Sequence, residues 1–237
     1  MSFRRIGIMG GTFDPIHWGH IEAGFAAEAA LKLMRLIVIP SSVPPHRDRP
    51  YASAFHRFAM VSLAAVGRNG WRASDLELRN DSESYTANTL QMFHERGYAP
   101  AELFFIIGAD AFADIASWKD YPTVLEYAHF AVVARPGYPI SDLPHRLPHL
   151  ADRMTKPPLD TISHLDPMIV LIDAPTSDVS ATGIRDRRIR GESIAGLVPD
   201  PVRQHIEQHG LYTSHTPGRR ASDAETAAVA GRVHGED

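Results

Sequence analysis

Short apolar segments alternate along the chain with longer segments that have helical patterning. The apolar runs predict strands at residues 5–9, 36–39, 71–78, 103–107, 130–134 and 168–172. The longer segments predict helices at residues 21–33, 54–66 and 86–96. Strands that alternate with helices imply parallel pairing, because each crossover helix packs back onto the sheet. We therefore expect an α/β fold: a Rossmann-like, doubly wound, mostly parallel sheet with helices on both faces.

Two segments depart from this alternation. Residues 136–167 contain seven prolines and little periodicity, which predicts an irregular excursion from the fold. Residues 213–237 are small, polar and aperiodic, which predicts a disordered tail. We expect the rest of the chain, residues 1–212, to form a single domain that includes the excursion.

Composition narrows the class of protein. The chain has 237 residues, of which 44 % are apolar and 22 % charged, as in ordinary soluble proteins. It has no cysteine, which excludes disulfides, thiolate metal sites and catalytic thiols. The net charge of −4 lacks the basic excess of a nucleic-acid surface, and no apolar run approaches the roughly 20 residues of a membrane span. We expect a cytoplasmic protein without nucleic-acid or membrane partners; a homo-oligomer is compatible with the sequence.

The most informative segment is GGTFDPIHWGH, residues 10–20, which follows a predicted strand and opens a predicted helix. Gly10 and Gly11 let a phosphate approach the backbone, and free N–H groups at a helix start favour an anion. His17 and His20 are three residues apart, so they share one face of a first helical turn. Two imidazoles beside a phosphate can donate hydrogen bonds as charge develops.

Other interpretations of this segment are weaker. It has neither the Walker pattern nor the G-x-G-x-x-G dinucleotide pattern, and H-x-x-H lacks a third zinc ligand. A tight turn with two unremarkable histidines is the plain structural alternative. Asp14, beside Pro15, fits a helix cap about as well as a ligand.

A second segment, SATGIR at residues 180–185, also suits phosphate oxygens. Ser180 and Thr182 supply hydroxyls, and Arg185 supplies a permanent charge with a bidentate fork. The structural alternative is a serine cap that opens a helix. The two interpretations are compatible, because a cap region is also an anion site.

Together these segments resemble the signatures of the H-x-G-H nucleotidyltransferase superfamily. Further segments resemble one of its families, the bacterial nicotinate mononucleotide adenylyltransferases. They are PPHR at 44–47, SYTANTL at 84–90, IGADA at 107–111 with Trp118 after it, ARPGY at 134–138 and LVPDPVRQHIEQHGLY at 197–212. The chain departs from the family pattern at Arg47, where a lysine is usual; the charge is kept but its shape and reach change.

The resemblance implies transfer of the adenylyl group of ATP to nicotinate mononucleotide, with release of pyrophosphate, in NAD biosynthesis. It implies Mg²⁺ held mainly by substrate phosphates, with no protein metal site. It implies catalytic roles for His17, His20, Arg47 and Arg185. It implies that ATP contacts Gly10, Gly11, Thr12, His20, Gly108, Asp110, Ser180, Thr182 and Arg185. The alternatives are a nicotinamide mononucleotide or phosphopantetheine adenylyltransferase on the same fold, or a non-catalytic nucleotide-binding module.

The resemblance also implies that nicotinate mononucleotide contacts Tyr85, Thr86 and Trp118. Tyr85 and Thr86 stand where a helix is predicted to begin, and free N–H groups there suit a carboxylate. Trp118 offers a flat face for the pyridine ring, although ordinary packing is its structural alternative. We therefore expect the acid to be preferred over the amide.

Overall fold

The computed structural model describes residues 4–43, 49–79, 83–158 and 166–213. Within these ranges, seven strands form one sheet in which every pairing is parallel. The order across the sheet is β3 (Trp71–Ala73), β2 (Arg35–Pro40), β1 (Ile6–Gly11), β4 (Leu103–Gly108), β5 (His129–Val133), β7 (Ile169–Ile172) and β6 (Met154–Thr155). This arrangement confirms the predicted Rossmann-like, doubly wound α/β fold.

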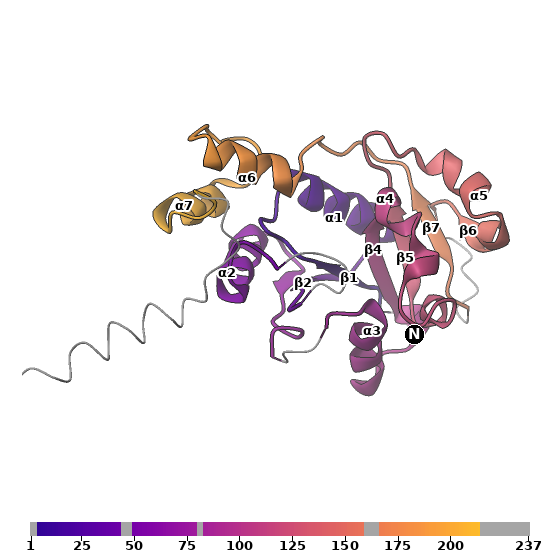
Figure 1. The fold of residues 1–237 in the computed structure, drawn as a ribbon. Coiled ribbons are helices and arrows are strands. Elements are labelled where there is room, and N and C mark those ends of the chain that lie inside the picture. The colour runs from indigo at the N-terminus through magenta and orange to yellow at the C-terminus, as the bar shows by residue number, and fades with distance from the viewer. Residues whose placement is uncertain (1–3, 44–48, 80–82, 159–165, 214–237) are drawn as a thin grey trace, which may run out of the picture.

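Helices cover both faces of the sheet (Figure 1). Buried residues of α1 (Trp18–Leu31), α2 (Ala54–Ala65), α6 (Ala181–Ile189) and α7 (Asp200–Gln208) belong to one apolar core. Buried residues of α3 (Thr86–Glu95), α4 (Ala109–Phe112) and α5 (Leu143–Arg146) belong to the other.

The strands contribute side chains to both cores, because successive side chains along a strand point to opposite faces of the sheet. In β4, Phe104 and Ile106 pack in the first core, whereas Phe105 and Ile107 pack in the second. A strand buried on both faces must be apolar at every position, which explains the continuous run at 103–107.

One glycine is required by close packing of a helix on the sheet. A Cβ at Gly24 of α1 would lie 2.4 Å from the ring of Trp71 in β3. The indole Nε1 donates a hydrogen bond to Glu28, one turn further along α1, at 2.9 Å. The absence of a side chain at Gly24 therefore leaves room for the Trp71 ring to pack against α1.

The prediction of a strand over 71–78 is wrong beyond Ala73. Ser74 N donates to Val38 O at 2.9 Å, which is the last contact with β2. The Ser74 hydroxyl then accepts from Leu76 N, and Leu78 N donates to Asp75 O. Serine and aspartate close the backbone on itself, so a turn replaces the extended chain.

The proline-rich excursion contains elements that its sequence did not indicate. These are the short 3₁₀ helices η4 (Ile140–Asp142) and η5 (Pro148–Arg153), the helix α5, and the edge strand β6, which pairs with β7. Ile140, Leu143 and Leu150 are buried and anchor the segment on the second core. One-turn elements have too few residues to show a period, so they escaped prediction. The predicted tail lies outside the described residues from position 214 onward.

Candidate active site

The loop that follows β1 is held by the carboxylate of Asp14. This side chain is 4 % exposed and accepts hydrogen bonds from Tyr51 N at 2.7 Å, Ala52 N at 3.0 Å and Tyr212 Oη at 2.8 Å. His17, not Asp14, is the N-cap residue of α1. Asp14 is therefore a structural anchor, and the expectation of a helix cap is wrong.

Arg57 of α2 ties the same loop to the end of β2. Its guanidinium is fully buried and donates to the backbone oxygens of Thr12 at 2.9 Å, Ser41 at 2.6 Å and Ala52 at 3.3 Å. Burial lowers the pKa of Arg57, and the nearby Asp14 carboxyl opposes this effect. Sequence analysis missed this residue, because an arginine in an amphipathic helix looks like any surface cation.

The two histidines of the loop lie against each other at the start of α1. Their ring centroids are 3.7 Å apart, and the backbone N–H of His17 donates to His20 Nδ1 at 3.3 Å. In a neutral ring that accepts at Nδ1, the proton resides on Nε2. The ring of His20 is half-buried.

His17 is an uncharged group at neutral pH. It is 2 % exposed, and its Nδ1 is buried without a hydrogen-bond partner in the described structure. Burial, together with the charge of the nearby Arg135 guanidinium, lowers the pKa of His17 to about 3. An unprotonated imidazole keeps one acceptor nitrogen and one donor nitrogen for the site.

Gly108 and Asp110 lie where β4 ends, next to β1 in the sheet. A Cβ at Gly108 would lie 2.5 Å from Asp110 Oδ1 and 2.7 Å from Arg135 Cδ, so a larger residue would displace these two side chains. Asp110 Oδ1 is buried without a hydrogen-bond partner in the described structure, and Asp110 Oδ2 lies 3.9 Å from Arg135. An orphaned buried carboxylate oxygen is suited to accept from a ligand hydroxyl.

Arg135 is a site residue to which sequence analysis gave no role. It follows β5 and lies near both Asp110 and His17. The ARPGY segment was the available indication, but only the order β1-β4-β5 brings its guanidinium to the loop after β1.

The SATGIR segment meets the first loop at the start of α6. Arg185 donates to the backbone oxygen of Asp14 at 2.8 Å and to Thr182 Oγ1 at 3.1 Å, and it lies 4.7 Å from the centre of the Tyr51 ring. The Ser180 hydroxyl accepts from Gly183 N at 3.1 Å, so Ser180 is the helix cap that the structural alternative expected.

Glu22 of α1 holds the segment that precedes α6. Ser177 donates to Glu22 of α1 through its backbone N at 2.5 Å and its hydroxyl at 2.8 Å. The two helix starts are therefore held in one region, with α6 beside α1 in Figure 1. Both starts offer free backbone N–H groups, which is favourable for several phosphate oxygens.

Two of the predicted nicotinate residues, Tyr85 and Thr86, lie at the start of α3, and Lys119, the residue after Trp118, contacts this helix start. Tyr85 precedes the first residue of α3, Thr86, as expected. Lys119 Nζ lies 4.7 Å from the centre of the Tyr85 ring and donates to Asn88 of α3 at 3.1 Å. Trp118, the residue before Lys119, is half-buried and packs against Phe105, with ring centroids 6.1 Å apart. Lys119 was missed, because its neighbour in space is 31 residues away in the chain.

Arg47 lies outside the described residues, so its predicted role stays a prediction. Val43, the last described residue before it, forms a parallel bridge with Glu83 and accepts from Ser84 N at 2.9 Å.

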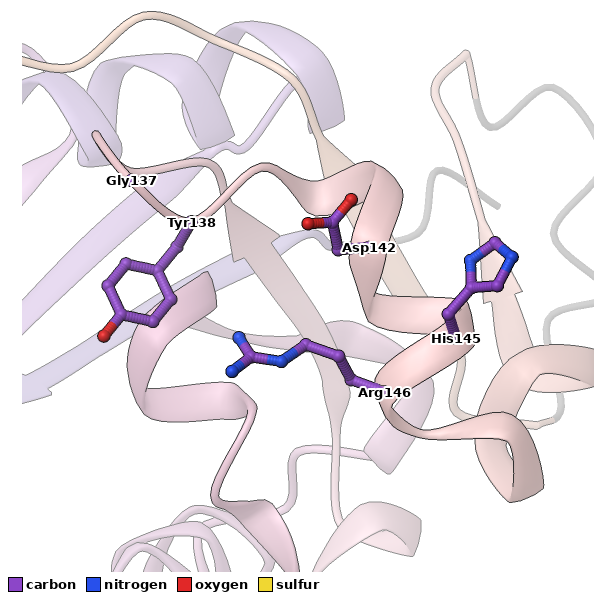
Figure 2. A pocket seen from close by; sticks show the side chains of 5 residues that line it. All are labelled: Gly137, Tyr138, Asp142, His145 and Arg146. Atoms are coloured by element: carbon purple, nitrogen blue, oxygen red, sulfur yellow. The ribbon is translucent and has the colours of Figure 1, made fainter.

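A surface hollow of about 590 Å³ lies apart from this group, in the excursion (Figure 2). It is lined by Gly137, Tyr138, Asp142, His145 and Arg146. Arg146 lies 5.8 Å from the centre of the Tyr138 ring. None of the predicted site residues lines it.

The fold and the grouped residues define a nucleotidyltransferase of the α/β class, with its ligand region at the switch point between β1 and β4. A family model described as "Cytidylyltransferase-like" matches residues 8–187. The chain is 38 % identical over 208 residues to a nicotinate-nucleotide adenylyltransferase of Escherichia coli O6:H1, across 86 % of this chain and 97 % of the relative. A probable enzyme of the same name from Escherichia coli O17:K52:H18 has the same identity and coverage.

The chain therefore belongs to the nicotinate-nucleotide adenylyltransferases, within the cytidylyltransferase-like proteins. A Plasmodium falciparum nicotinic acid mononucleotide adenylyltransferase, solved in complex with NaAD, shares the fold with a TM-score of 0.66 and 18 % identity. That match covers 88 % of this chain and 97 % of the solved one. Across the described residues, no helix has the length and apolar character that crossing a membrane requires.

Proposed function

We propose that this chain transfers the adenylyl group of ATP to nicotinate mononucleotide and releases pyrophosphate. The observation that carries the proposal is the convergence of His17, His20 and Arg185 on the loop after β1, beside the end of the adjacent strand β4, where Gly108 and Asp110 lie. A non-catalytic nucleotide-binding module would need no preorganised imidazole pair at a phosphate-binding helix start. A cytoplasmic location is part of the proposal, because both substrates are charged nucleotides.

The chemistry requires no nucleophile from the protein. A phosphate oxygen of nicotinate mononucleotide attacks the α-phosphorus of ATP, and the bond to the β-phosphate oxygen breaks as pyrophosphate leaves. Catalysis then consists of alignment and charge stabilisation. His20 donates from Nε2 to an α-phosphate oxygen, and neutral His17 orients the ring beside it.

Arg185 holds the leaving group in this mechanism. In the structure its two terminal nitrogens are bonded to a backbone oxygen and a threonine hydroxyl, which are weaker partners than phosphate. Exchange of these contacts for β- and γ-phosphate oxygens costs little, because the guanidinium already lies at the α6 start. Arg135 supplies a second cation near His17.

The pyridine end of the acceptor is assigned to the start of α3. Its first-turn N–H groups and the positive end of the helix favour a carboxylate. Lys119 adds a cation 4.7 Å from the Tyr85 ring, which strengthens the preference for an acid. Trp118 packs on the ring, in this proposal, without distinguishing acid from amide.

Reactions of this class with ATP generally use a divalent metal, and we propose Mg²⁺. The described groups near the phosphate region are mostly arginines and hydroxyls, and Asp14 is already bonded to three protein donors. Asp110 Oδ1 is the buried carboxylate oxygen of the site that lacks a hydrogen-bond partner in the described structure. This donor set fits a metal held mainly by the triphosphate and water, which reduces the charge on the phosphates when bound.

The test is a comparison of kcat/KM for nicotinate and nicotinamide mononucleotides. Charged hydrogen bonds are roughly twice as strong as neutral ones, so we expect the acid to be favoured by about ten- to a hundredfold. Lys119→Met should reduce this ratio, whereas Trp118→Ala should weaken both substrates alike. Equal use of the amide by the parent enzyme would overturn the acceptor assignment and leave only the nucleotidyltransferase class.

A further inference from the structure

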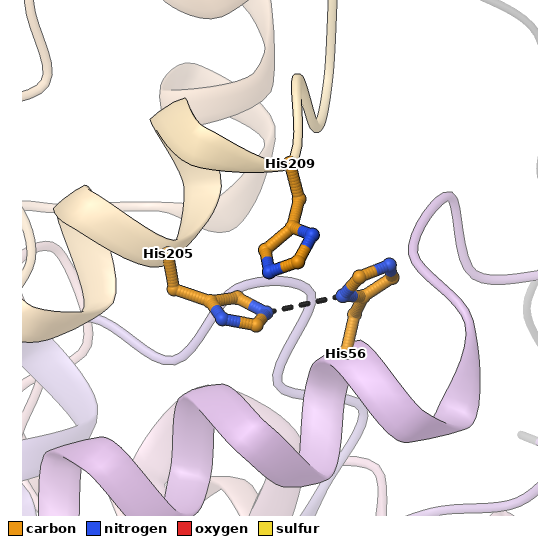
Figure 3. Close-up of side chains that lie close together, drawn as sticks. All are labelled: His56, His205 and His209. Atoms are coloured by element: carbon orange, nitrogen blue, oxygen red, sulfur yellow. Dashed lines mark hydrogen bonds between the residues drawn. The ribbon is translucent and has the colours of Figure 1, made fainter.

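Three histidines form a cluster between α2 and α7, away from the nucleotide site (Figure 3). His56 lies in the first turn of α2, His205 in the last turn of α7, and His209 at the C-cap of α7. His205 and His209 are four residues apart, so they share one face of the helix, and both face His56. Among the described residues, these three histidines are the group of potential metal ligands that lie close enough together to bind one ion.

The spacing of the ring nitrogens is close to that of a metal site. One nitrogen from each ring lies within 4.8 Å of the others, and His56 Nδ1 is 3.1 Å from His205 Nε2. Two imidazoles on one zinc ion, each about 2.0–2.1 Å from it in tetrahedral geometry, have nitrogens about 3.3 Å apart. The exposed ring of His209 completes the triangle after a small rotation about its side-chain bonds.

Packing alone accounts poorly for this arrangement. The three rings meet in pairs with centroids 4.4–5.2 Å apart, and a hydrogen bond joins two of them, His56 and His205. Three imidazoles packed together become repulsive when protonated, whereas neutral imidazoles that converge on a point are natural ligands. The nearby Arg203 of α7 is already paired with Asp200 and Glu207, at 3.3 and 2.9 Å.

We propose that His56, His205 and His209 bind one transition-metal dication of the zinc type, with a fourth position open to water. Imidazole favours Zn²⁺, Cu²⁺ or Ni²⁺ over Mg²⁺, which prefers oxygen ligands. The site is therefore chemically separate from the Mg²⁺ that accompanies ATP, and it does not depend on the proposed function.

A metal here would brace the loop that carries His17 and His20. The start of α2 follows Tyr51 and Ala52, whose N–H groups hold Asp14, and Tyr212 beyond α7 holds the same carboxylate. A metal that links α2 to α7 would therefore restrain both groups of hydrogen-bond donors to Asp14, the one before α2 and the one after α7. The expected effect is on stability, because a ligand that binds only the folded state raises its melting temperature.

The test uses the full chain after removal of metals with a chelator. We expect one equivalent of Zn²⁺ to bind, with a rise in Tm of roughly 5–10 °C at a hundredfold excess over Kd. Co²⁺ in place of Zn²⁺ should give the visible absorption of a cobalt ion with nitrogen ligands. Each of His56→Gln, His205→Gln and His209→Gln should weaken Zn²⁺ binding by about 100-fold or more.

Matched controls separate this site from the other histidines of the chain. His145→Gln, in the excursion, and a chain with both His215→Gln and His234→Gln should bind Zn²⁺ as the parent does. His209→Gln is the most informative variant, since its exposed side chain can be replaced without disturbing the core. Zn²⁺ binding of unchanged affinity in His209→Gln, or the absence of a stoichiometric site in the parent, would overturn the proposal. Adenylyl transfer is not measured, so failure here leaves the proposed function unaffected.

Discussion

At the scale of single residues, the site depends on side chains whose chemistry is changed by burial. His17 is almost fully buried beside Arg135 and is neutral, whereas His20, three residues later, is half-exposed and accepts a backbone hydrogen bond. In the proposed mechanism the same residue type thus serves for orientation in one position and for donation to substrate in the other. Neither role follows from the histidine alone, since each is set by neighbours contributed from β5 and α1.

Replacement of His20 should affect the reaction far more than ATP binding. Removal of one preorganised donor typically costs about 10²–10³ in rate, so we expect kcat of His20→Ala to fall by that amount with a nearly unchanged ATP Kd. Steady-state kinetics and direct ATP binding provide the measurement. His20→Gln is the matched control, because glutamine at this helix position restores the bond from the His17 N–H without an imidazole. Full activity in either folded variant would contradict the assignment.

Stability should fall in acid through buried histidines. The pKa of His17 is lowered to about 3 and that of His129 to about 4, in both cases mainly by burial, from an ordinary value of 6.5. The unfolded chain therefore binds protons that the folded chain excludes, and stability present above pH 6.5 is lost as pH falls toward 4. Urea unfolding between pH 7 and pH 4 measures this loss. His129→Gln, which keeps an acceptor for Met168 N, should show a smaller loss, and an unchanged slope would refute the explanation.

At the scale of elements, the starts of α1 and α6 are capped and, in the proposed function, also bind phosphate. The start of α6 is closed by the Ser180 cap and also presents Thr182 and Arg185, while the start of α1 is closed by two histidines. Helix starts carry unpaired N–H groups, so a cap and an anion site use the same donors. At Ser180 the structure shows the cap, and the proposed phosphate site would use the same helix start.

Variants at Ser180 separate these two tasks. Ser180→Ala should lose the bond to Gly183 N, which costs about 1 kcal/mol of unfolding free energy, and should raise the KM for ATP. Ser180→Asn should restore stability, since asparagine is an equally good cap, but it changes the group offered to phosphate. Denaturant unfolding and ATP kinetics of the two variants give the answer. If asparagine restores both properties in full, Ser180 is only a cap.

At the scale of the whole molecule, the first loop is held by the far end of the chain. Tyr212 donates to Asp14, 198 residues earlier, and Arg185 donates to the backbone of the same residue. Burial raises the pKa of the Tyr212 hydroxyl well above its usual value, and the Asp14 charge adds to this effect. The hydroxyl therefore remains a hydrogen-bond donor at all working pH values.

Loss of this long-range bond should weaken both stability and catalysis. Tyr212→Phe leaves a buried carboxylate with one donor fewer, which costs about 1–3 kcal/mol of unfolding free energy. We expect kcat to fall with it, because Asp14 sets the position of the loop that carries the histidines. Thermal unfolding and turnover check the prediction, with Tyr98→Phe as a control on the opposite face. Wild-type kinetics in Tyr212→Phe would show that the loop holds its position without the chain end.

The sequence by itself determined the alternation of strands and helices, and hence the parallel doubly wound sheet. It also identified the motifs that follow β1, span the end of β4 and open α6, because these features are local: periodicity, turn chemistry and short motifs act over a few neighbours. The sequence did not predict the end of β3 at Ala73 or the short elements at 140–155. The difference in free energy between a short turn and an extended segment is small, so local sequence does not decide between them.

Only the tertiary structure decided which distant groups share a site. Arg135 reaches His17, Lys119 reaches Tyr85, and Arg57 reaches Thr12 because the order and register of the strands place their flanking loops together. The meeting of His56 with His205 and His209 has the same origin, 149 residues apart in the chain. Such contacts depend on many packing interactions across the whole sheet, and they cannot be predicted from a local sequence pattern.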